Sequence, residues 1–215
     1  MKYKLVLFDL DGTLLDTLPD LGDAINFVLR KYGYKERTYE EVCSFIGNGA
    51  GQLCYLSLPE NDKSRFEEFL EEYKEYYATH SMVKTKPYDG IVELVNWLVD
   101  SGVIVGVLSN KPDKTTKSVV AHYINDKIFA IGESETVKRK PDPAGINKII
   151  SDLEIDKGDV IYIGDSEVDI KTCRNAGIRC ISVSWGFRTK DYLIEAGAET
   201  IVDSITELRA VLKAL

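Results

Sequence analysis

Short runs of apolar and β-branched residues recur along the chain, with helix-like stretches between them. The runs cover residues 4–8, 103–108, 127–131, 160–163, 180–184 and 200–202. Apolar and polar positions do not alternate within these runs, which is typical of strands that are covered on both faces. The pattern therefore predicts a parallel β-sheet.

Helical patterns separate these runs and supply the crossover connections that parallel strands require. They cover residues 90–101, 114–122, 143–153, 167–176 and 205–215. The predicted fold class is α/β, with a doubly wound, Rossmann-like parallel sheet as its core. In such sheets, ligands bind at the carboxyl ends of the strands, near a switch in strand order.

The interval 16–83 breaks this alternation, because it contains helix patterns and no convincing strand. Its clearest feature is an aromatic stripe at three- and four-residue spacing, formed by Phe66, Phe69, Leu70, Tyr73, Tyr76 and Tyr77. The stripe would be either a ligand surface or the buried seam of a small helical bundle. We favour the seam because aromatic side chains dominate core burial. An all-helical insert is therefore expected directly after the first strand.

Composition narrows the range of partners. The chain has 215 residues, 44% of them hydrophobic and 29% charged, which is ordinary for a folded globular protein. The formal net charge of -8 repels nucleic acid unless basic residues cluster on one face. The compact basic run Lys138-Arg139-Lys140 is too short for such a surface. We therefore expect no nucleic-acid partner.

The cysteines and the apolar segments indicate the compartment. Cys43, Cys54, Cys173 and Cys180 form neither CxxC pairs nor a zinc-like cluster, so buried or half-buried free thiols are expected. The apolar run at the start is too short for a signal peptide, and no run approaches the roughly 20 apolar residues of a membrane span. These features favour a reducing cytoplasm and no membrane partner.

The first predicted strand ends in Asp9-Leu10-Asp11-Gly12-Thr13, which places two carboxylates where an α/β sheet presents its ligands. The plainer alternative is a turn capped by aspartates. A calcium-binding EF-hand is excluded, because it requires Gly and Glu where this chain has Leu14 and Asp20.

Polar residues also follow the second strand and one later connection. Ser109 and Asn110 end the strand at 103–108 and could donate hydrogen bonds to phosphate, or could merely start the next turn. Lys140 precedes Pro141 and Pro143 at a predicted helix start. It would be either a cation held for an anionic ligand or part of a solvated basic run.

A third strand, at 160–163, is followed by Gly164-Asp165-Ser166-Glu167-Val168-Asp169. Asp165 and Asp169 would lie on one face of the first helical turn, although either could simply cap that helix. The fold brings all these strand ends to one edge. Carboxylates gathered there would repel one another unless a cation intervened, and Mg2+ with oxygen ligands is the usual solution.

These residues resemble the haloacid dehalogenase superfamily of phosphatases. The resemblance rests on DLDGT at 9–13, Ser109, Lys140-Pro141 and GDSEVD at 164–169, in that order across nearly the whole chain. It implies an enzyme that transfers phosphate from a small ester to an aspartate and then to water, with Mg2+ as its cofactor. The implied partner is a small phosphorylated metabolite, and the implied assembly is a monomer or a homodimer.

The resemblance also implies roles for individual acids. Asp9 would be the nucleophile and Asp11 the general acid and base, so that one difficult displacement is divided into two easier ones. Mg2+ would be held by the Asp9 carboxylate, the Asp11 backbone carbonyl and Asp165. Asp169 and Ser166 would lie outside this ligand shell, with Asp169 orienting metal-bound water and Lys140.

The same resemblance implies the phosphate contacts. The backbone after Asp9, at Leu10, Gly12 and Thr13, would hold the transferred phosphoryl group together with Ser109, with Asn110 nearby. Thr13 would hydrogen-bond within its own loop. Lys140 would offset charge on the nucleophile and on the phosphate.

The strand-free insert matches the helical cap of this family. The implied boundaries are a core of residues 1–15 and 85–215 and a cap of residues 16–84, with hinges near 15–16 and 83–86. Within the cap, Gly47, Asn48 and Gly49 are similar to a loop of the phosphoglycolate phosphatases, although they could form a plain interhelical turn. As a substrate loop, their amides would bind the carboxylate of a small acidic ester.

The favoured substrate is accordingly 2-phosphoglycolate. Phosphosugars, pyrophosphate and a non-catalytic sensing role are the alternatives. Dehalogenases lack the second acid that is present here as Asp11. Hexose phosphate mutases carry a histidine shortly after the first motif, where this chain has none before His80.

Overall fold

The computed structural model describes residues 2–215. It divides into two compact units, one made of residues 2–15 and 87–215 and the other of residues 16–86. Each unit has its own hydrophobic core.

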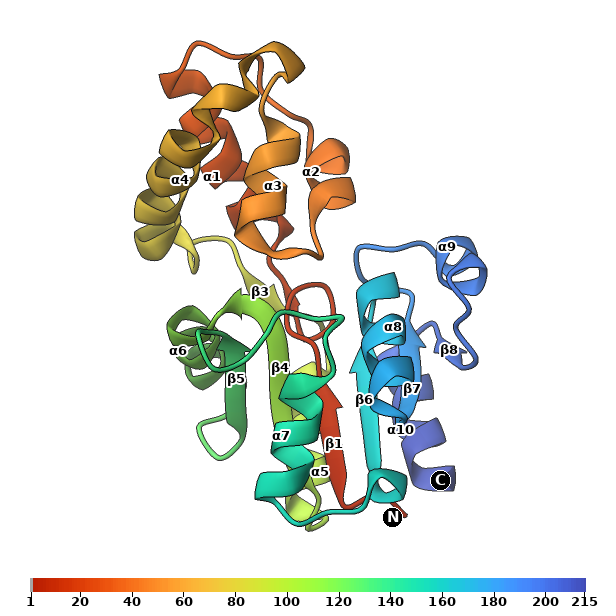
Figure 1. The fold of residues 1–215 in the computed structure, drawn as a ribbon. Coiled ribbons are helices and arrows are strands. Elements are labelled where there is room, and N and C mark those ends of the chain that lie inside the picture. The colour runs from red at the N-terminus through yellow and green to blue at the C-terminus, as the bar shows by residue number, and fades with distance from the viewer. Residues whose placement is uncertain (1) are drawn as a thin grey trace. The chain divides into compact units, whose positions relative to one another are not determined.

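The larger unit is built on a six-stranded parallel sheet with the strand order β5-β4-β1-β6-β7-β8 (Figure 1). The strands are β1 (Leu5–Phe8), β4 (Ile104–Pro112), β5 (Phe129–Glu133), β6 (Val160–Gly164), β7 (Arg179–Val183) and β8 (Ile201–Val202). The first strand lies in the middle, and the chain moves outward from it in both directions. This confirms the predicted doubly wound α/β fold.

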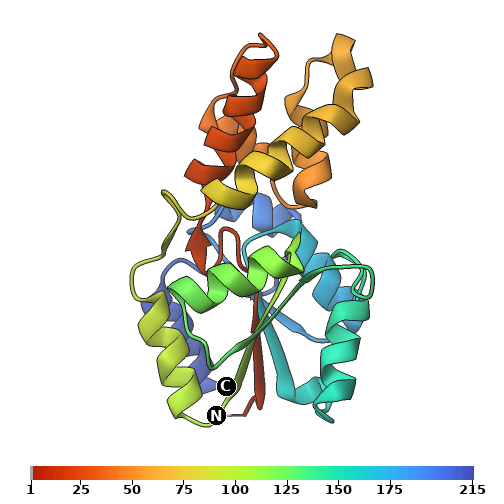
Figure 2. The ribbon, with the colours of Figure 1, turned by 90° about the vertical axis from the view of Figure 1, so that its left-hand side faces the viewer.

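Helices cover both faces of the sheet, as Figure 2 shows. Helices α5 (Ile91–Asp100), α6 (Asp113–Tyr123) and α10 (Ile205–Ala214) share one apolar cluster with the sheet residues Val6, Phe8 and Ile161. Helices α7 (Ala144–Asp152) and α8 (Glu167–Ala176) form the other cluster with Leu5 and Tyr162. Consecutive strand residues point to opposite faces, so apolar side chains are needed at every position.

The strand ends differ from the sequence prediction in one important place. Strand β4 does not stop at Leu108 but continues through Ser109, Asn110 and Lys111 to Pro112. These polar residues form an irregular stretch of the strand, between the paired residues Leu108 and Pro112, instead of a turn. A short helix α9 (Lys190–Glu195) and a 3-10 turn η2 (Lys157–Asp159) were not predicted, because both are too short for a helical period to show.

The smaller unit is helical. Its elements are α1 (Leu18–Lys31), α2 (Tyr39–Phe45), α3 (Gly49–Ser57), the 3-10 segment η1 (Glu60–Arg65) and α4 (Phe66–His80). From the aromatic stripe, Phe69, Tyr73 and Tyr77 are buried against the apolar residues of α1. The stripe is thus the seam of a helical bundle, as favoured from the sequence.

Both ends of the helical unit are fastened by one carboxylate. Asp20, in the first turn of α1, accepts hydrogen bonds from the backbone N–H groups of Val83, Lys84 and Thr85 and from the Thr85 hydroxyl, at 2.8 to 3.1 Å. Its side chain is buried. Nearby, the short strands β2 (Leu15–Asp16) and β3 (Lys86–Pro87) pair with each other where the chain leaves and re-enters the larger unit.

The cysteines are free, with Cys54 and Cys173 buried and Cys43 and Cys180 half-buried, which confirms the expectation for them. Within residues 2–215, no helix has the length and apolar character needed to span a bilayer.

Candidate active site

The first strand delivers two aspartates into a tight loop. Asp9 extends the pairing of β1, because its N–H donates to the Ile163 carbonyl at 2.8 Å. The Leu10 carbonyl then accepts from the N–H groups of Thr13, Leu14 and Leu15, which folds the chain back on itself. Gly12 has a φ of 85°, in the left-handed region that favours glycine. A side chain there would also collide with Asp165, since a Cβ would lie 2.3 Å from Asp165 Oδ2.

Lys140 lies at the centre of the site. Its Nζ is 2.8 Å from Asp9 Oδ1, 2.7 Å from Asp169 Oδ1 and 2.9 Å from the Tyr162 hydroxyl. The side chain is only 4% exposed. Burial opposes the charge on Lys140, but the neighbouring carboxylates of Asp169 and Asp9 outweigh it and raise the pKa of the ammonium. Lys140 is therefore a fixed cation, not part of a solvated basic run.

Asn110 holds the backbone of Lys140. Its Oδ1 accepts from Lys140 N–H at 2.7 Å, and its Nδ2 donates to the Lys140 carbonyl at 3.0 Å. This two-way contact joins the end of β4 to a segment 30 residues further along the chain. A direct contact of Asn110 with phosphate, suggested from the sequence, stays a prediction; the bonds here make it a positioning residue for Lys140.

Asp169 is held rigidly at the start of α8. The backbone N–H and the hydroxyl of Ser166 donate to Asp169 Oδ2 at 3.1 and 2.6 Å, while Oδ1 faces Lys140. Both carboxylate oxygens therefore have partners within the protein. A carboxylate so occupied is suited to orienting Lys140 more than to binding a metal directly.

Asp165 is oriented by two segments that are distant in sequence. Thr13 Oγ1 donates to its Oδ1 at 3.2 Å, and the Phe187 N–H donates to its Oδ2 at 2.7 Å. The Thr13 N–H donates to the Leu10 carbonyl within the loop, as expected, and the Thr13 hydroxyl in addition reaches across to the 164–169 segment. The compact loop turns the Thr13 side chain toward this neighbouring strand end.

The segment after β7 was missed from the sequence. Trp185 Nε1 donates to the Thr13 carbonyl at 3.1 Å. Gly186 packs so closely that a Cβ would lie 2.3 Å from the Gly12 carbonyl oxygen and 2.4 Å from Asp165 Cβ. These contacts press the Asp9-to-Thr13 loop and Asp165 together. The only sequence signal was a Trp-Gly-Phe tripeptide directly after a predicted strand.

Three carboxylates gather at this point. Oxygen atoms of Asp9, Asp165 and Asp169 all lie within 4.8 Å of one another. Burial, partly opposed by Lys140, raises the pKa of Asp9 to about 7. Burial together with Asp9 and Asp169 raises the pKa of Asp165 well above its ordinary value. Ionised acids are unfavourable here without more positive charge, and an all-oxygen donor set fits a hard divalent cation.

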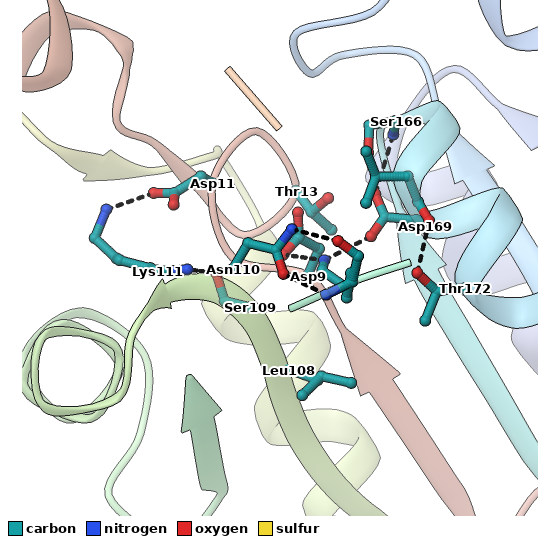
Figure 3. A network of polar contacts seen from close by, with 12 residues as sticks. Asp9, Asp11, Thr13, Leu108, Ser109, Asn110, Lys111, Ser166, Asp169 and Thr172 are labelled. Atoms are coloured by element: carbon teal, nitrogen blue, oxygen red, sulfur yellow. Dashed lines mark hydrogen bonds and ion pairs between the residues drawn. The ribbon is translucent and has the colours of Figure 1, made fainter. Parts of the chain in front are cut away.

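Asp11 lies outside that cluster of side chains. Its Oδ1 is 2.8 Å from Lys111 Nζ, with Lys111 only 3% and Asp11 16% exposed at the side chain (Figure 3). Lys111 was assigned no role of its own from the sequence, although it directly follows Ser109-Asn110. Ser109 is buried beside it, and its hydroxyl accepts from Lys111 N–H at 3.2 Å.

The predicted cap loop lies in the helical unit. Gly47 and Gly49 have φ values of 128° and 78°, and α3 begins at Gly49 with Asn48 as its N-cap. These glycines therefore allow a sharp helix start, which gives them a structural reason to be present. Substrate binding by Gly47, Asn48 and Gly49 stays a prediction.

Comparison with known proteins identifies the class. The family model for haloacid dehalogenase-like hydrolases matches residues 6–183. This range contains the ends of β1, β4 and β6, which carry the candidate aspartates and Ser109, as well as Lys140. The chain belongs to the haloacid dehalogenase-like hydrolase family and is an enzyme of its phosphatase type.

Individual relatives refine this picture. Phosphoglycolate phosphatase 1 of Pseudomonas aeruginosa is 31% identical over 214 residues, covering 95% of this chain and 78% of the relative. The N-acetylmuramic acid 6-phosphate phosphatase of the same organism is 34% identical over 219 residues, covering 99% of this chain and 96% of the relative. A crystal structure from Lactobacillus delbrueckii, provisionally assigned as a phosphoglycolate phosphatase, matches with a TM-score of 0.92 at 34% identity over 99% of each chain.

Proposed function

We propose that this chain is a Mg2+-dependent phosphatase that hydrolyses a small phosphate monoester through an aspartyl phosphate, an acyl phosphate formed on Asp9. The observation that carries the proposal is the placement of Asp9. Asp9 directly follows the central strand β1. Its carboxylate contacts the Lys140 ammonium and lies within 4.8 Å of the Asp165 and Asp169 carboxylates. A buried nucleophile paired with a cation and facing further acids is suited to phosphoryl transfer.

The reaction divides into two displacements. An Asp9 oxygen attacks phosphorus and the ester P–O bond breaks, while Asp11 gives its proton to the departing oxygen. Asp11 then takes a proton from water, the water oxygen attacks phosphorus, and the Asp9–phosphate bond breaks to release inorganic phosphate. Ser109 and the backbone after Asp9 would hold the phosphoryl oxygens, and Lys140 keeps Asp9 in place.

Mg2+ fits the acids present. The Asp9 and Asp165 carboxylates and the Asp11 backbone carbonyl would hold it, while Asp169 and Ser166 orient their neighbours from behind. When bound, the ion supplies positive charge to the phosphoryl oxygens. The segment after β7 would hold Asp165 and the Asp9-to-Thr13 loop in position for this role, through the contacts of Trp185, Gly186 and Phe187.

For the substrate, we favour 2-phosphoglycolate, in line with the relatives named as phosphoglycolate phosphatases. N-acetylmuramic acid 6-phosphate is a second candidate, because the relative named for it has nearly the same length as this chain. Both compounds are phosphate esters that also carry a carboxylate. The helical unit would serve as the cap, with Gly47, Asn48 and Gly49 as its candidate substrate loop.

The nucleophile assignment is tested with Asp9→Asn and the matched control Asp152→Asn, which makes the same change on an exposed helix pair. Phosphate release from a panel of esters is measured with Mg2+, together with acid-stable, base-labile 32P on quenched protein. We expect turnover and labelling to fall by at least about 10³-fold in Asp9→Asn only. Undiminished turnover in Asp9→Asn would exclude the covalent mechanism.

A further inference from the structure

Lys111 is a buried cation on the opposite side of Asp11 from the carboxylate cluster (Figure 3). It is the residue before the last of β4, its side chain is 3% exposed, and its Nζ is 2.8 Å from Asp11 Oδ1. A buried ammonium is costly unless it meets negative charge. An ammonium also has three N–H donors, so it can bond to more than one carboxylate oxygen.

The contact between Lys111 and Asp11 places Lys111 near the site where the leaving group would depart. In the proposed reaction Asp11 protonates the departing ester oxygen, so the two must come within about 2.6 to 3.2 Å. Lys111 is one hydrogen bond from the same carboxylate. Its ammonium would therefore lie within reach of the first atoms of a leaving group that is protonated by Asp11.

The other cation of the site is committed elsewhere. Lys140 Nζ contacts three oxygen atoms, from Asp9, Asp169 and Tyr162. A leaving group that carried its own negative charge would meet repulsion from Asp9 and Asp11. Beside Asp11, Lys111 is a buried cation that is placed to offset it.

We propose that Lys111 selects phosphate esters with a carboxylate on the carbon next to the ester oxygen. This inference rests on the proposed function. In 2-phosphoglycolate the carboxylate carbon is two bonds from the ester oxygen, within reach of an ammonium that already touches Asp11. In N-acetylmuramic acid 6-phosphate a sugar ring separates the two groups, so its carboxylate falls outside that reach. Lys111 thus favours the first of the two candidate substrates.

The test compares two esters of nearly equal size, 2-phosphoglycolate and 2-hydroxyethyl phosphate, with N-acetylmuramic acid 6-phosphate as a third. The variants are Lys111→Met, Lys111→Arg and the control Lys117→Met, which removes the same charge from an exposed ion pair. We expect kcat/KM in the wild type to favour 2-phosphoglycolate over 2-hydroxyethyl phosphate by about 30-fold, as one charge-assisted hydrogen bond would give. Lys111→Met should remove most of this ratio, Lys111→Arg should keep part of it, and Lys117→Met should keep all of it.

Each outcome has a separate meaning. If Lys111 only positions Asp11, Lys111→Met slows all three esters equally and the ratio stays, which overturns the inference. Equal wild-type kcat/KM for the two small esters overturns it without any variant, so a Lys111→Met protein that fails to fold does not block the test. Failure to hydrolyse any ester would instead contradict the proposed phosphatase function.

Discussion

Two sets of buried aspartates in this protein differ in how their charge is satisfied. Asp20, in the helical unit, accepts hydrogen bonds from three backbone N–H groups and one hydroxyl. Asp9 and Asp165, in the core unit, face each other and Asp169 within 4.8 Å. Buried charge that is fully hydrogen-bonded supports the fold, whereas buried charge that meets like charge costs stability and indicates a functional site.

The largest expected effect is on activity at the core cluster. Asp165→Asn keeps the shape of the side chain but removes one negative charge from the proposed Mg2+ site. We expect phosphatase activity to fall by about 10³-fold, as when one charge-stabilising group is lost. Stability of the metal-free variant, measured by urea denaturation, should stay within about 1 kcal/mol of the wild type, because the lost charge was poorly compensated. A large loss of stability would contradict the contrast with Asp20.

The next effect is on stability at the helical unit. Asp20→Asn replaces an acceptor oxygen with an NH2 group that faces backbone N–H donors. We expect a loss of about 3 kcal/mol of unfolding free energy, since hydrogen bonds to a buried charge are removed. Urea denaturation followed by circular dichroism measures this loss. Asp23→Asn, a change on the half-exposed Asp23–Lys84 ion pair, is the control and should cost less than about 1 kcal/mol.

A smaller effect links pH to the metal. Folding raises the pKa of Asp9 from 3.8 to about 7, so the folded metal-free protein binds more protons than the unfolded chain between these values. The contribution of Asp9 to the stability of the metal-free protein should therefore be largest below pH 4, and it should be lost as the pH rises through about 7. Asp165, whose pKa is also raised, acts in the same direction.

Bound Mg2+ should cancel this penalty. We expect the increase in Tm on adding Mg2+ to be larger at pH 8 than at pH 5.5 by about 5 °C, which corresponds to roughly 2 kcal/mol for a chain of this size. Differential scanning calorimetry with and without EDTA measures the difference. In Asp165→Asn the pH dependence should shrink. An increase in Tm that is independent of pH would contradict a metal bound by these acids.

Much of the fold followed from local patterns. The six apolar runs predicted the parallel sheet, and helix periodicity predicted the main crossovers, because burial on both faces leaves an uninterrupted apolar signal. The ends of elements were less accessible. Strand β4 runs on through Ser109, Asn110 and Lys111 to Pro112, which pairs with Glu133 of β5. The polar residues in this stretch interrupt the apolar pattern, so the sequence did not predict the extension.

The candidate site divides in the same way. Most candidate residues were recognisable because they follow a predicted apolar run or lie near a predicted helix start, and a parallel sheet brings such positions to one edge. They are Asp9, Asp11, Ser109, Lys140, Asp165 and Asp169. The Thr13 hydrogen bond to Asp165 joins residues 152 positions apart, and no local pattern predicts it. From its place next to Ser109, Asn110 was expected to donate a hydrogen bond to phosphate. In the structure its side chain bonds to the backbone of Lys140.

The sequence by itself determined which chemical groups are present and which strand ends carry them, since apolar periodicity and short motifs are local properties. Only the tertiary structure decided how these groups pair. It placed Lys111 against Asp11, Tyr162 behind Lys140 and Phe187 against Asp165, because such contacts depend on strand order and on close packing between distant segments. Those pairings separate the buried acid that holds the helical unit together from the acids proposed to act on phosphate.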